Sequence, residues 1–369
     1  MSVFLQNTIT NGIKRLVRLG LWCYFKEIHI QGFSKEAHGA SVIYMANHQN
    51  ALLDALLIAA HTHRKTTFIS RSDVFKNPFI GAFLRYIGML PIYRFRDGVD
   101  TLKKNKPIFE RCGIILDQGE AILIFPEGNH GYKRKLRPLK KGFLQLLSQR
   151  WKLGKAPVFI APMGLNYEDL TQFPDRVSVI FGSPLLCEKE SVEAEVSEVL
   201  IDRVANALRD LTTHIPLDSE ADYKRCLQFL HANNANFLDP VATRELIHEF
   251  MSPYPNEALH SDNSNNTKDT YSEEKPSRPS ATSRRSIFVL FFHIVNALPI
   301  FIWRKYMRPA VVQKEFISTL RFAFCMVFYP LFYLFLATGI WLLTKNIGAA
   351  VAAPIVFFSF NLLSVKKLL

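Results

Sequence analysis

Short runs of apolar and β-branched residues alternate with longer stretches of helical periodicity through the first two thirds of the chain. Six such runs predict β-strands at residues 41–45, 66–70, 90–93, 121–125, 158–161 and 177–181. Helical spacing predicts helices over residues 100–118, where Pro107 disturbs the pattern, and over residues 191–213. This alternation predicts an α/β sheet with helices on both faces.

The carboxyl end has a different pattern, with three long uncharged runs at residues 287–303, 322–344 and 346–365. A helix needs about 20 apolar residues to cross about 30 Å of hydrocarbon, so the second and third runs qualify as transmembrane spans. The first run contains His293, Asn296 and Pro299, which a buried helix would have to satisfy. Because basic residues tend to stay in the cytoplasm, we expect this run to dip or lie flat, giving two or three membrane helices. The other two runs then form a hairpin whose external charge is Lys345.

The first 30 residues predict an amphipathic helix. Its apolar face follows i, i+3, i+4 spacing, and its bases lie off that face: Ile13, Leu16, Val17, Gly20, Leu21 and Tyr24 against Lys14, Arg15 and Arg18. We expect this helix to associate with a membrane surface, and an ordinary helix packed on the domain is the alternative. Residues 251–286, rich in Ser, Asn and Pro, predict a flexible linker. The predicted organisation is therefore helix 1–30, α/β domain 31–250, linker 251–286 and membrane region 287–369.

Composition narrows the compartment and the partners. The chain has 45 Lys plus Arg and 32 Asp plus Glu, a formal charge of +13, and residues 287–369 contain eight of the bases and one acid. More than half of the excess charge therefore lies beside membrane segments, which explains it without a nucleic acid. Five cysteines show no CxxC or Cys/His spacing, so we expect no disulfide framework, no metal site and reduced thiols in the cytosol.

A histidine and an aspartate follow the first predicted strand, at positions 48 and 54. A neutral imidazole can accept a proton from an alcohol, and a carboxylate on its far nitrogen fixes the tautomer and stabilises the imidazolium. Only residues three or four apart share a helix face, so the two meet if His48 lies in the turn before a helix and Asp54 inside it. Taken alone, such a histidine is more often structural.

Three further motifs end other predicted strands. Glu127 and Gly128 place a carboxylate and a turn at the carboxyl edge of a sheet, where α/β proteins bind ligands. Arg94 offers a guanidinium that matches phosphate oxygens, although it could equally pair with a surface acid such as Asp97. Pro162 closes an apolar strand whose prolines imply an edge or a kink. Six bases between positions 133 and 141 could neutralise a phosphate or form only a solvated loop: Lys133, Arg134, Lys135, Arg137, Lys140 and Lys141.

Together these motifs resemble the glycerolipid acyltransferase family, which comprises glycerol-3-phosphate and lysophosphatidate acyltransferases. They are an NH…D box at 47–54, GMLPIYR at 88–94, FPEG at 125–128 and PVFIAP at 157–162, with RPLKKG at 137–142 and FGSP at 181–184. The resemblance covers about residues 20 to 215 and does not extend to the tail. It implies a central mixed sheet flanked by helices. The first box usually has four residues between His and Asp, whereas this one has five, and an arginine usually stands where this chain has His130.

Carried over by position, the resemblance makes His48 the general base and Asp54 its orienting partner. It makes Arg94, Glu127 and Gly128 binders of a phosphorylated glycerol acceptor. Pro162 becomes a wall of the apolar side of the site. The further candidates for binding the acceptor are His130, Lys133, Arg134 and Arg137.

The implied activity is that of a membrane-bound O-acyltransferase of phospholipid biosynthesis, using an acyl thioester and a glycerol-3-phosphate or lysophosphatidate acceptor. Acyl-CoA or acyl-carrier protein would be the donor, with no bound cofactor and no covalent intermediate. The expected location is the cell membrane, with the catalytic domain facing the cytoplasm and membrane lipids as partners. Two alternatives remain open: acylation of another lipid hydroxyl, for example on an acylated amino acid, and a non-catalytic lipid-binding membrane protein.

Overall fold

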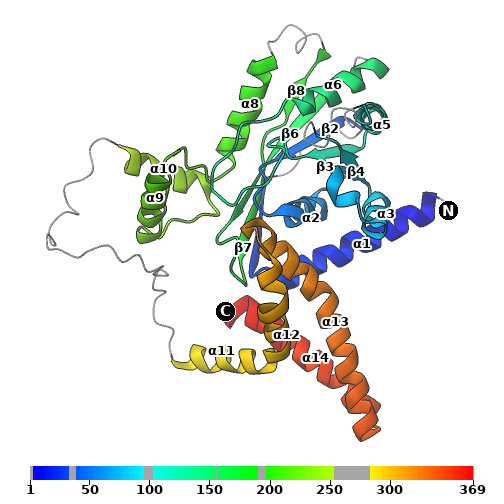
Figure 1. Ribbon diagram of the computed structural model, residues 1–369, viewed down its shortest axis with the longest axis vertical. Helices are drawn as coiled ribbons and strands as arrows, with labels where there is room; N and C mark the ends of the chain where they lie inside the picture. Colours follow the sequence, from blue (N-terminus) through cyan, green and yellow to red (C-terminus); the bar gives the residue numbers. More distant parts are fainter. Residues whose placement is uncertain are drawn as a thin grey trace, which may run out of the picture.

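The computed structural model describes residues 3–32, 39–94, 103–154, 156–189, 197–252 and 283–368. Within these residues, eight strands form one sheet in the order β1-β7-β6-β2-β5-β3-β4, with β8 also paired to β6 (Figure 1). Strand β6 runs antiparallel to β7 and β8, and the other pairs are parallel, so the predicted mixed sheet is confirmed. The strands are β1 (Glu27–Gln31), β2 (Ser41–Ala46), β3 (Thr66–Arg71), β4 (Met89–Ile92), β5 (Ala121–Ile124), β6 (Val158–Tyr167), β7 (Arg176–Phe181) and β8 (Leu185–Cys187).

Strand β6 is longer than predicted and lies inside the sheet, although its proline suggested an edge. On one side it pairs with β2 from Val158 to Met163. On the other side its partner changes from β8, which ends its pairing at Ile160, to β7, which begins at Met163. Pro162 therefore falls at the break between two ladders, where a missing N–H interrupts neither of them.

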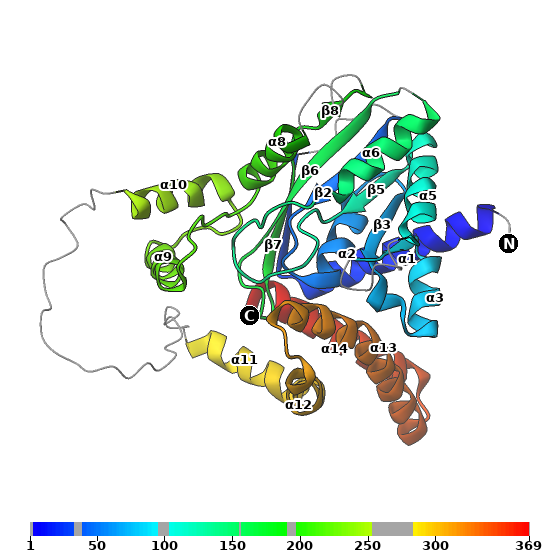
Figure 2. The same ribbon diagram turned by 45° about the horizontal axis from the view of Figure 1, so that its top comes forward.

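Helices cover both faces of the sheet, as predicted (Figure 2). One face packs against α1 (Val3–Tyr24) and α2 (Ala51–His61), and the other against α5 (Asn105–Asp117), α6 (Gly142–Leu153) and α8 (Ser197–Asp210). Strand β2 contributes Val42 and Tyr44 to the first core and Ile43 and Met45 to the second. Successive side chains of a strand point to opposite faces, so β2 is buried on both.

The predicted helices at 100–118 and 191–213 correspond to α5 and α8 within the described residues. Helix α5 begins at Asn105, so Pro107 lies in its first turn, where a missing N–H costs little. Helix α6 and strands β1 and β8 were not predicted. Nor were α3 (Pro78–Tyr86), after the 3-10 turn η1 (Ser72–Phe75), or α9 (Glu220–Ala232) and α10 (Pro240–Met251), which share a small separate core.

Helix α1 packs on the domain through part of its apolar face. Leu21 and Tyr24 are buried in the core. Two of its bases, Lys14 and Arg18, donate hydrogen bonds to carbonyls at the end of α2. These are the contacts expected of an ordinary packed helix, which was the alternative interpretation of this segment. Leu16, Leu19 and Trp22 remain exposed, and membrane association of α1 stays a prediction.

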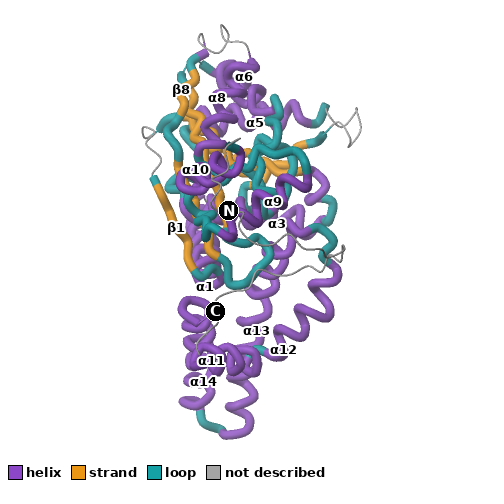
Figure 3. Tube along the Cα trace, turned by 90° about the vertical axis from the view of Figure 1, so that its left-hand side faces the viewer, coloured by secondary structure: helices purple, strands orange, loops and turns teal. Residues whose placement is uncertain are grey.

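The carboxyl region contains α11 (Ser283–Val295), α12 (Ala297–Ile302), α13 (Ile317–Thr344) and α14 (Ile347–Leu363). Helices α13 and α14 are each long and apolar enough to cross a membrane, and they form a hairpin that turns at Lys345 (Figure 3). Before them, the helical segments 288–295 and 297–310 meet at an angle of 73°, which gives a third span if they are one broken helix. Most of the predicted linker, residues 253–282, lies outside the described residues.

Both ends of the hairpin are attached to the catalytic domain. The first turns of α13 pack against α1 and α2. After α14, in the terminal turn η7 (Ser364–Leu368), the Lys366 ammonium donates to the carbonyl of Phe25 over 2.7 Å. The turn at Lys345 lies at the far end of the hairpin, away from the sheet (Figure 1).

Candidate active site

The candidate residues gather at the carboxyl edge of the parallel part of the sheet. Strands β2, β5, β3 and β4 are neighbours and run parallel, so their carboxyl ends lie side by side. His48 follows β2 and Glu127 follows β5, while Arg71 ends β3 and Arg94 follows β4. Open α/β sheets bind ligands at this edge.

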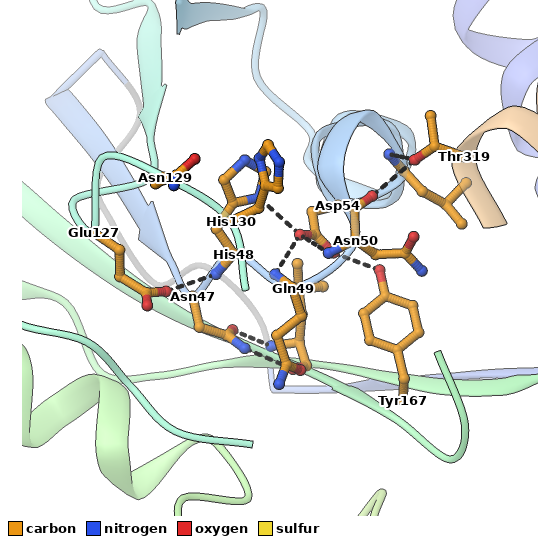
Figure 4. Close-up of polar contacts among 12 residues, drawn as sticks. Asn47, His48, Gln49, Asn50, Asp54, Glu127, Asn129, His130, Tyr167 and Thr319 are labelled. Atoms are coloured by element: carbon orange, nitrogen blue, oxygen red, sulfur yellow. Dashed lines mark hydrogen bonds and ion pairs between the residues drawn. The ribbon is translucent and has the colours of Figure 1, made fainter. Parts of the chain in front are cut away.

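The turn between β2 and α2 brings His48 onto the first turn of the helix. Nδ1 of His48 lies 2.8 Å from Oδ2 of Asp54 (Figure 4). Asn50 precedes α2, and Ala51 has a left-handed φ of 44°, so the chain reverses within the six positions that separate the two residues. The pair therefore forms with His48 in the turn and Asp54 in the helix, in spite of the additional residue between them.

Asp54 is fully buried, and its carboxylate accepts hydrogen bonds from four groups. Oδ2 accepts from the backbone N–H of Gln49 (2.8 Å) and of Asn50 (2.7 Å), in addition to the imidazole. Oδ1 accepts from the hydroxyl of Tyr167 (2.5 Å), whose pKa is raised well above its usual value by burial and by the charge of Asp54. Because the carboxylate only accepts, Nδ1 of His48 carries the proton and Nε2 presents a lone pair.

The glutamate turn fixes the backbone of His48. Oε1 of Glu127 accepts from the N–H of His48 (2.8 Å), and the N–H of Gly131 donates to the carbonyl of His48 (3.1 Å). Oε2 of Glu127 accepts from the backbone N–H (3.0 Å) and Nε (2.8 Å) of Arg137. Gly128 supplies the turn with a φ of 71°, which favours glycine. In this structure Glu127 and Arg137 hold the turn together around His48.

Aromatic rings surround the imidazole of His48. The ring of Phe125 stacks on it with centroids 3.9 Å apart, and the ring of His130 meets it edge-on at 5.5 Å. Phe316, from the segment that leads into α13, in turn meets His130 edge-on at 4.7 Å. Burial lowers the pKa of His130, and the neighbouring His48 adds to this effect. His130 is therefore mostly neutral at pH 7, unlike the arginine that usually stands at this place.

Two arginines lie around one carboxylate at the same edge. Nη2 of Arg94 is 3.5 Å from Oδ2 of Asp73 in η1, and Arg71 also pairs with Asp73. Asp97, the alternative partner for Arg94, lies outside the described residues. A guanidinium group matches phosphate oxygens bidentately, so these two arginines suit a phosphate.

The other candidates have different surroundings. Lys133 pairs with Glu220 of α9, and Arg134 donates to the carbonyls of Tyr167 and Glu168. These two side chains turn toward α9 and α10 and are not brought to the His48 ring. Pro162 is buried in the sheet, at the register position of Met45. A role of these three residues in acceptor binding stays a prediction.

Sequence reasoning missed several residues of the site. The sequence contained a signal for Arg71, because this arginine directly follows a predicted strand, as Arg94 does. Tyr167 and Phe316 had none, because only the tertiary fold brings them to Asp54 and His130. The same holds for Thr319, which contacts the start of α2. Among the described residues, no group of three or more His, Cys, Asp or Glu side chains could hold a metal ion.

A histidine that is oriented by a buried carboxylate, with its second nitrogen at a sheet edge, has the geometry that general-base catalysis requires. The family model described as Acyltransferase matches residues 27–166. The chain is 32% identical over 143 residues to a chloroplastic 1-acyl-sn-glycerol-3-phosphate acyltransferase of Arabidopsis thaliana, covering 38% of this chain and 37% of that protein. It is 28% identical over 153 residues to a 1-acyl-sn-glycerol-3-phosphate acyltransferase of Helicobacter pylori, covering 41% and 61% of the two chains.

A crystal structure of the 1-acyl-sn-glycerophosphate (LPA) acyltransferase PlsC of Thermotoga maritima matches with a TM-score of 0.40 and 18% identity, covering 56% of this chain and 80% of that one. Residues 27–166 therefore form an acyltransferase domain that is similar to 1-acyl-sn-glycerol-3-phosphate acyltransferases. The aligned region spans between about a third and three fifths of the length of these curated relatives.

Proposed function

We propose that this protein transfers a fatty acyl group from an acyl thioester to the free hydroxyl of a lysophosphatidate-type acceptor at a membrane surface. The observation that carries the proposal is the contact of His48 with the buried Asp54, which leaves Nε2 of the imidazole as the base. The names of the relatives, 1-acyl-sn-glycerol-3-phosphate acyltransferases, support this choice of acceptor.

The proposed reaction needs one base that later acts as an acid. Nε2 of His48 takes the proton of the acceptor hydroxyl while the oxygen attacks the thioester carbonyl carbon. The tetrahedral intermediate collapses, the carbon–sulfur bond breaks, and the leaving thiolate takes the proton back from His48. Asp54 stabilises the imidazolium between these two steps, and the four donors around its carboxylate hold it in place.

The position of the site next to the membrane hairpin supports a lipid acceptor. Helix α13 has 28 residues, a length of about 42 Å at 1.5 Å per residue, whereas the hydrocarbon layer is about 30 Å thick. Its first turns, which include Arg321 and touch the domain, therefore extend beyond the hydrocarbon. The site then lies at the bilayer surface, where a soluble thioester donor and a lipid acceptor can meet.

Arg71 and Arg94 are the cations that we propose for the acceptor phosphate. They lie at the edge of β3 and β4, and neutral His130 supplies no charge beside His48. If the acceptor has no phosphate, as for an acylated amino acid, these arginines have no such role. Replacing either one by glutamine should then leave the KM for the true acceptor unchanged.

The test is acyl transfer by the full chain in lipid nanodiscs, with labelled acyl-CoA or acyl-carrier protein as donor. The acceptors to compare are lysophosphatidate, glycerol-3-phosphate, lysophosphatidylcholine and an N-acyl amino acid. We expect lysophosphatidate to be preferred and His48→Ala to reduce the rate by about 10²-fold to 10⁴-fold. His29→Ala, on the exposed edge strand β1, is the matched control and should keep the activity. Transfer that survives in His48→Ala would reject the mechanism, and lipid binding without transfer to any acceptor would favour the non-catalytic alternative.

A further inference from the structure

Residues 313–322, the docking segment, lead from the bent helices into the membrane-spanning part of α13. The resemblance of the chain to acyltransferases ends at about residue 215, so the motifs assign this segment no role. In the structure its Phe316 ring meets the His130 ring edge-on, with ring centroids 4.7 Å apart. The segment therefore reaches the wall of the site that faces His48.

The second contact is with the start of α2, the helix that carries Asp54. The first N–H groups of a helix lack partners within the helix, and a side chain before it usually supplies one. Asn50, which occupies that place, makes no such bond with its side chain. The N–H of Leu53 donates to the carbonyl of Asn50 (3.0 Å) and also to Oγ1 of Thr319 (3.1 Å). The Thr319 hydroxyl in turn donates to the same Asn50 carbonyl (2.9 Å), as Figure 4 shows. A residue of the membrane helix thus caps the catalytic helix.

The docking segment is firmly seated in the domain. The Ser318 hydroxyl donates to the carbonyl of Leu170 (2.6 Å). Nε of Arg321 donates to the Tyr24 hydroxyl (2.8 Å), and its Nη1 donates to the carbonyl of Thr171 (3.1 Å). Phe322 is buried in the main core. Thr319 is therefore fixed by its sequence neighbours on both sides, and its hydroxyl can in turn fix the start of α2.

The start of α2 needs a contact from outside the helix to keep its conformation. Ala51 adopts a left-handed φ of 44°, a conformation that costs a residue with a side chain about 1 to 3 kcal/mol and persists only when its surroundings impose it. The peptide groups next to this position, at Asn50 and Leu53, are those that Thr319 binds. Two of the four donors to Asp54, the N–H groups of Gln49 and Asn50, belong to the same turn.

We propose that Thr319 is a positioning residue for catalysis: its hydroxyl fixes the start of α2 and thereby holds Asp54 against His48, so that the membrane hairpin completes the catalytic site. The inference rests on the proposed function, since it assigns a role within the same site. It implies that residues 287–369 do more than attach the domain to a membrane. The catalytic pair is correctly arranged only when α13 is seated on the domain.

The test compares Thr319→Val, which keeps the shape and removes both hydrogen bonds, with Thr338→Val on the same helix. Thr338 is exposed and bonds only to the carbonyl of Leu334 in its own helix, so it serves as the control. We expect Thr319→Val to lower kcat by about tenfold to a hundredfold, because small displacements of catalytic groups have effects of this size, without raising the KM for the acyl donor. Thr319→Ser should restore the rate, and Thr338→Val should not change it.

A second readout does not depend on activity. The proton shared by Nδ1 of His48 and Asp54 is followed by NMR as a far-downfield resonance, assigned by its loss in His48→Asn. It should weaken or disappear in Thr319→Val, or in Thr319→Ala if the first variant does not fold, and persist in Thr319→Ser and Thr338→Val. A wild-type resonance in the Val and Ala variants, or a serine variant that behaves like the valine variant, overturns the proposal. If the wild-type chain transfers no acyl group, the proposed function fails, and the resonance still decides the role of Thr319.

Discussion

Asp54 is the most constrained residue of the site, because every hydrogen bond around it is directed at a carboxylate. In Asp54→Asn, the amide NH₂ would face the Tyr167 hydroxyl or two backbone N–H groups, which are donors as well. A buried donor without an acceptor costs about 1 to 3 kcal/mol. We expect this variant to lose activity by about 10²-fold or more and to unfold at lower temperature. Asp218→Asn, at a fully exposed position, is the control for both measurements, and an Asp54→Asn variant with normal kcat would contradict the assignment.

His214 predicts a pH dependence of stability outside the catalytic pair. Its Nδ1 accepts from the N–H of Leu136 (2.9 Å), and its pKa is lowered to about 4 by burial and by the nearby Arg209, Lys135 and Arg244. The unfolded chain binds this proton near pH 6.5, so the free energy of unfolding falls as the pH drops from about 6.5 to about 4.

We expect this loss to be about 1 to 2 kcal/mol, because partial exposure of the ring weakens the effect. His214→Asn keeps an acceptor for Leu136 and removes the titration, so its unfolding free energy should vary less across the same pH range. Urea unfolding at pH 7 and pH 5 measures the difference. An identical pH dependence in the variant and the wild type would refute the explanation.

Single residues also show how far the sequence could predict the site. The contact between His48 and Asp54 could be predicted from their spacing, on the condition that a turn carries His48 and a helix carries Asp54. The sequence identified Glu127 as a site residue, but it did not predict which groups Glu127 contacts. It suggested a carboxylate that binds a ligand, whereas the two carboxylate oxygens contact the His48 turn and Arg137. Tyr167 could not be predicted, because its contact with Asp54 depends on how a neighbouring strand pairs.

At the scale of elements, strong apolar periodicity was predictive and weak periodicity was not. The six predicted strands are all present, since each is an apolar run between turn signals. The short strand β1 has the sequence EIHIQ, and all of its residues except one are exposed, so no pattern marked it. The ends of helix α2 were equally hard to predict from the sequence. Its first turn is capped by Thr319, and the carbonyls at its other end accept hydrogen bonds from Lys14 and Arg18.

A polar network at the bend between α11 and α12 predicts that this bend holds the first apolar segment to the hairpin. The side chain of Asn296 donates to Oδ1 of Asn361 (2.7 Å) and accepts from the Tyr329 hydroxyl (2.8 Å), which joins the bent segment to both helices of the hairpin. Such bonds between apolar helices contribute about 0.6 kcal/mol on average and up to about 1.7 kcal/mol.

Asn296→Leu removes this link, so residues 288–302 should exchange amide hydrogens faster in nanodiscs, measured by mass spectrometry. Thr338→Val, which removes only a bond within its own helix, should leave the exchange of that segment as it is in the wild type. Unchanged exchange in Asn296→Leu would show that apolar packing alone holds the bent segment to the hairpin.

At the scale of the whole molecule, the arrangement of the hairpin determines which parts of the chain face the same side of a membrane. Helix α13 starts on the catalytic domain, and the residues after α14 return to it through the contact of Lys366 with Phe25. Each helix is long enough to cross once, so the turn at Lys345 must lie on the opposite side. Because a single base lies at that turn and many bases flank the domain side, we predict that the domain faces the cytoplasm.

Labelling of single cysteines in sealed vesicles with an impermeant maleimide tests this arrangement. With the five native cysteines replaced, Lys345→Cys should react only from the side opposite to Glu198→Cys, which is an exposed position on α8. Arg304→Cys, between the bent segment and α13, should react from the same side as Glu198→Cys, because a segment that dips or lies flat returns to the side it started from. If Arg304→Cys is accessible only from the side opposite to Glu198→Cys while Arg285→Cys is accessible from the same side as Glu198→Cys, the first segment crosses and the chain has three spans.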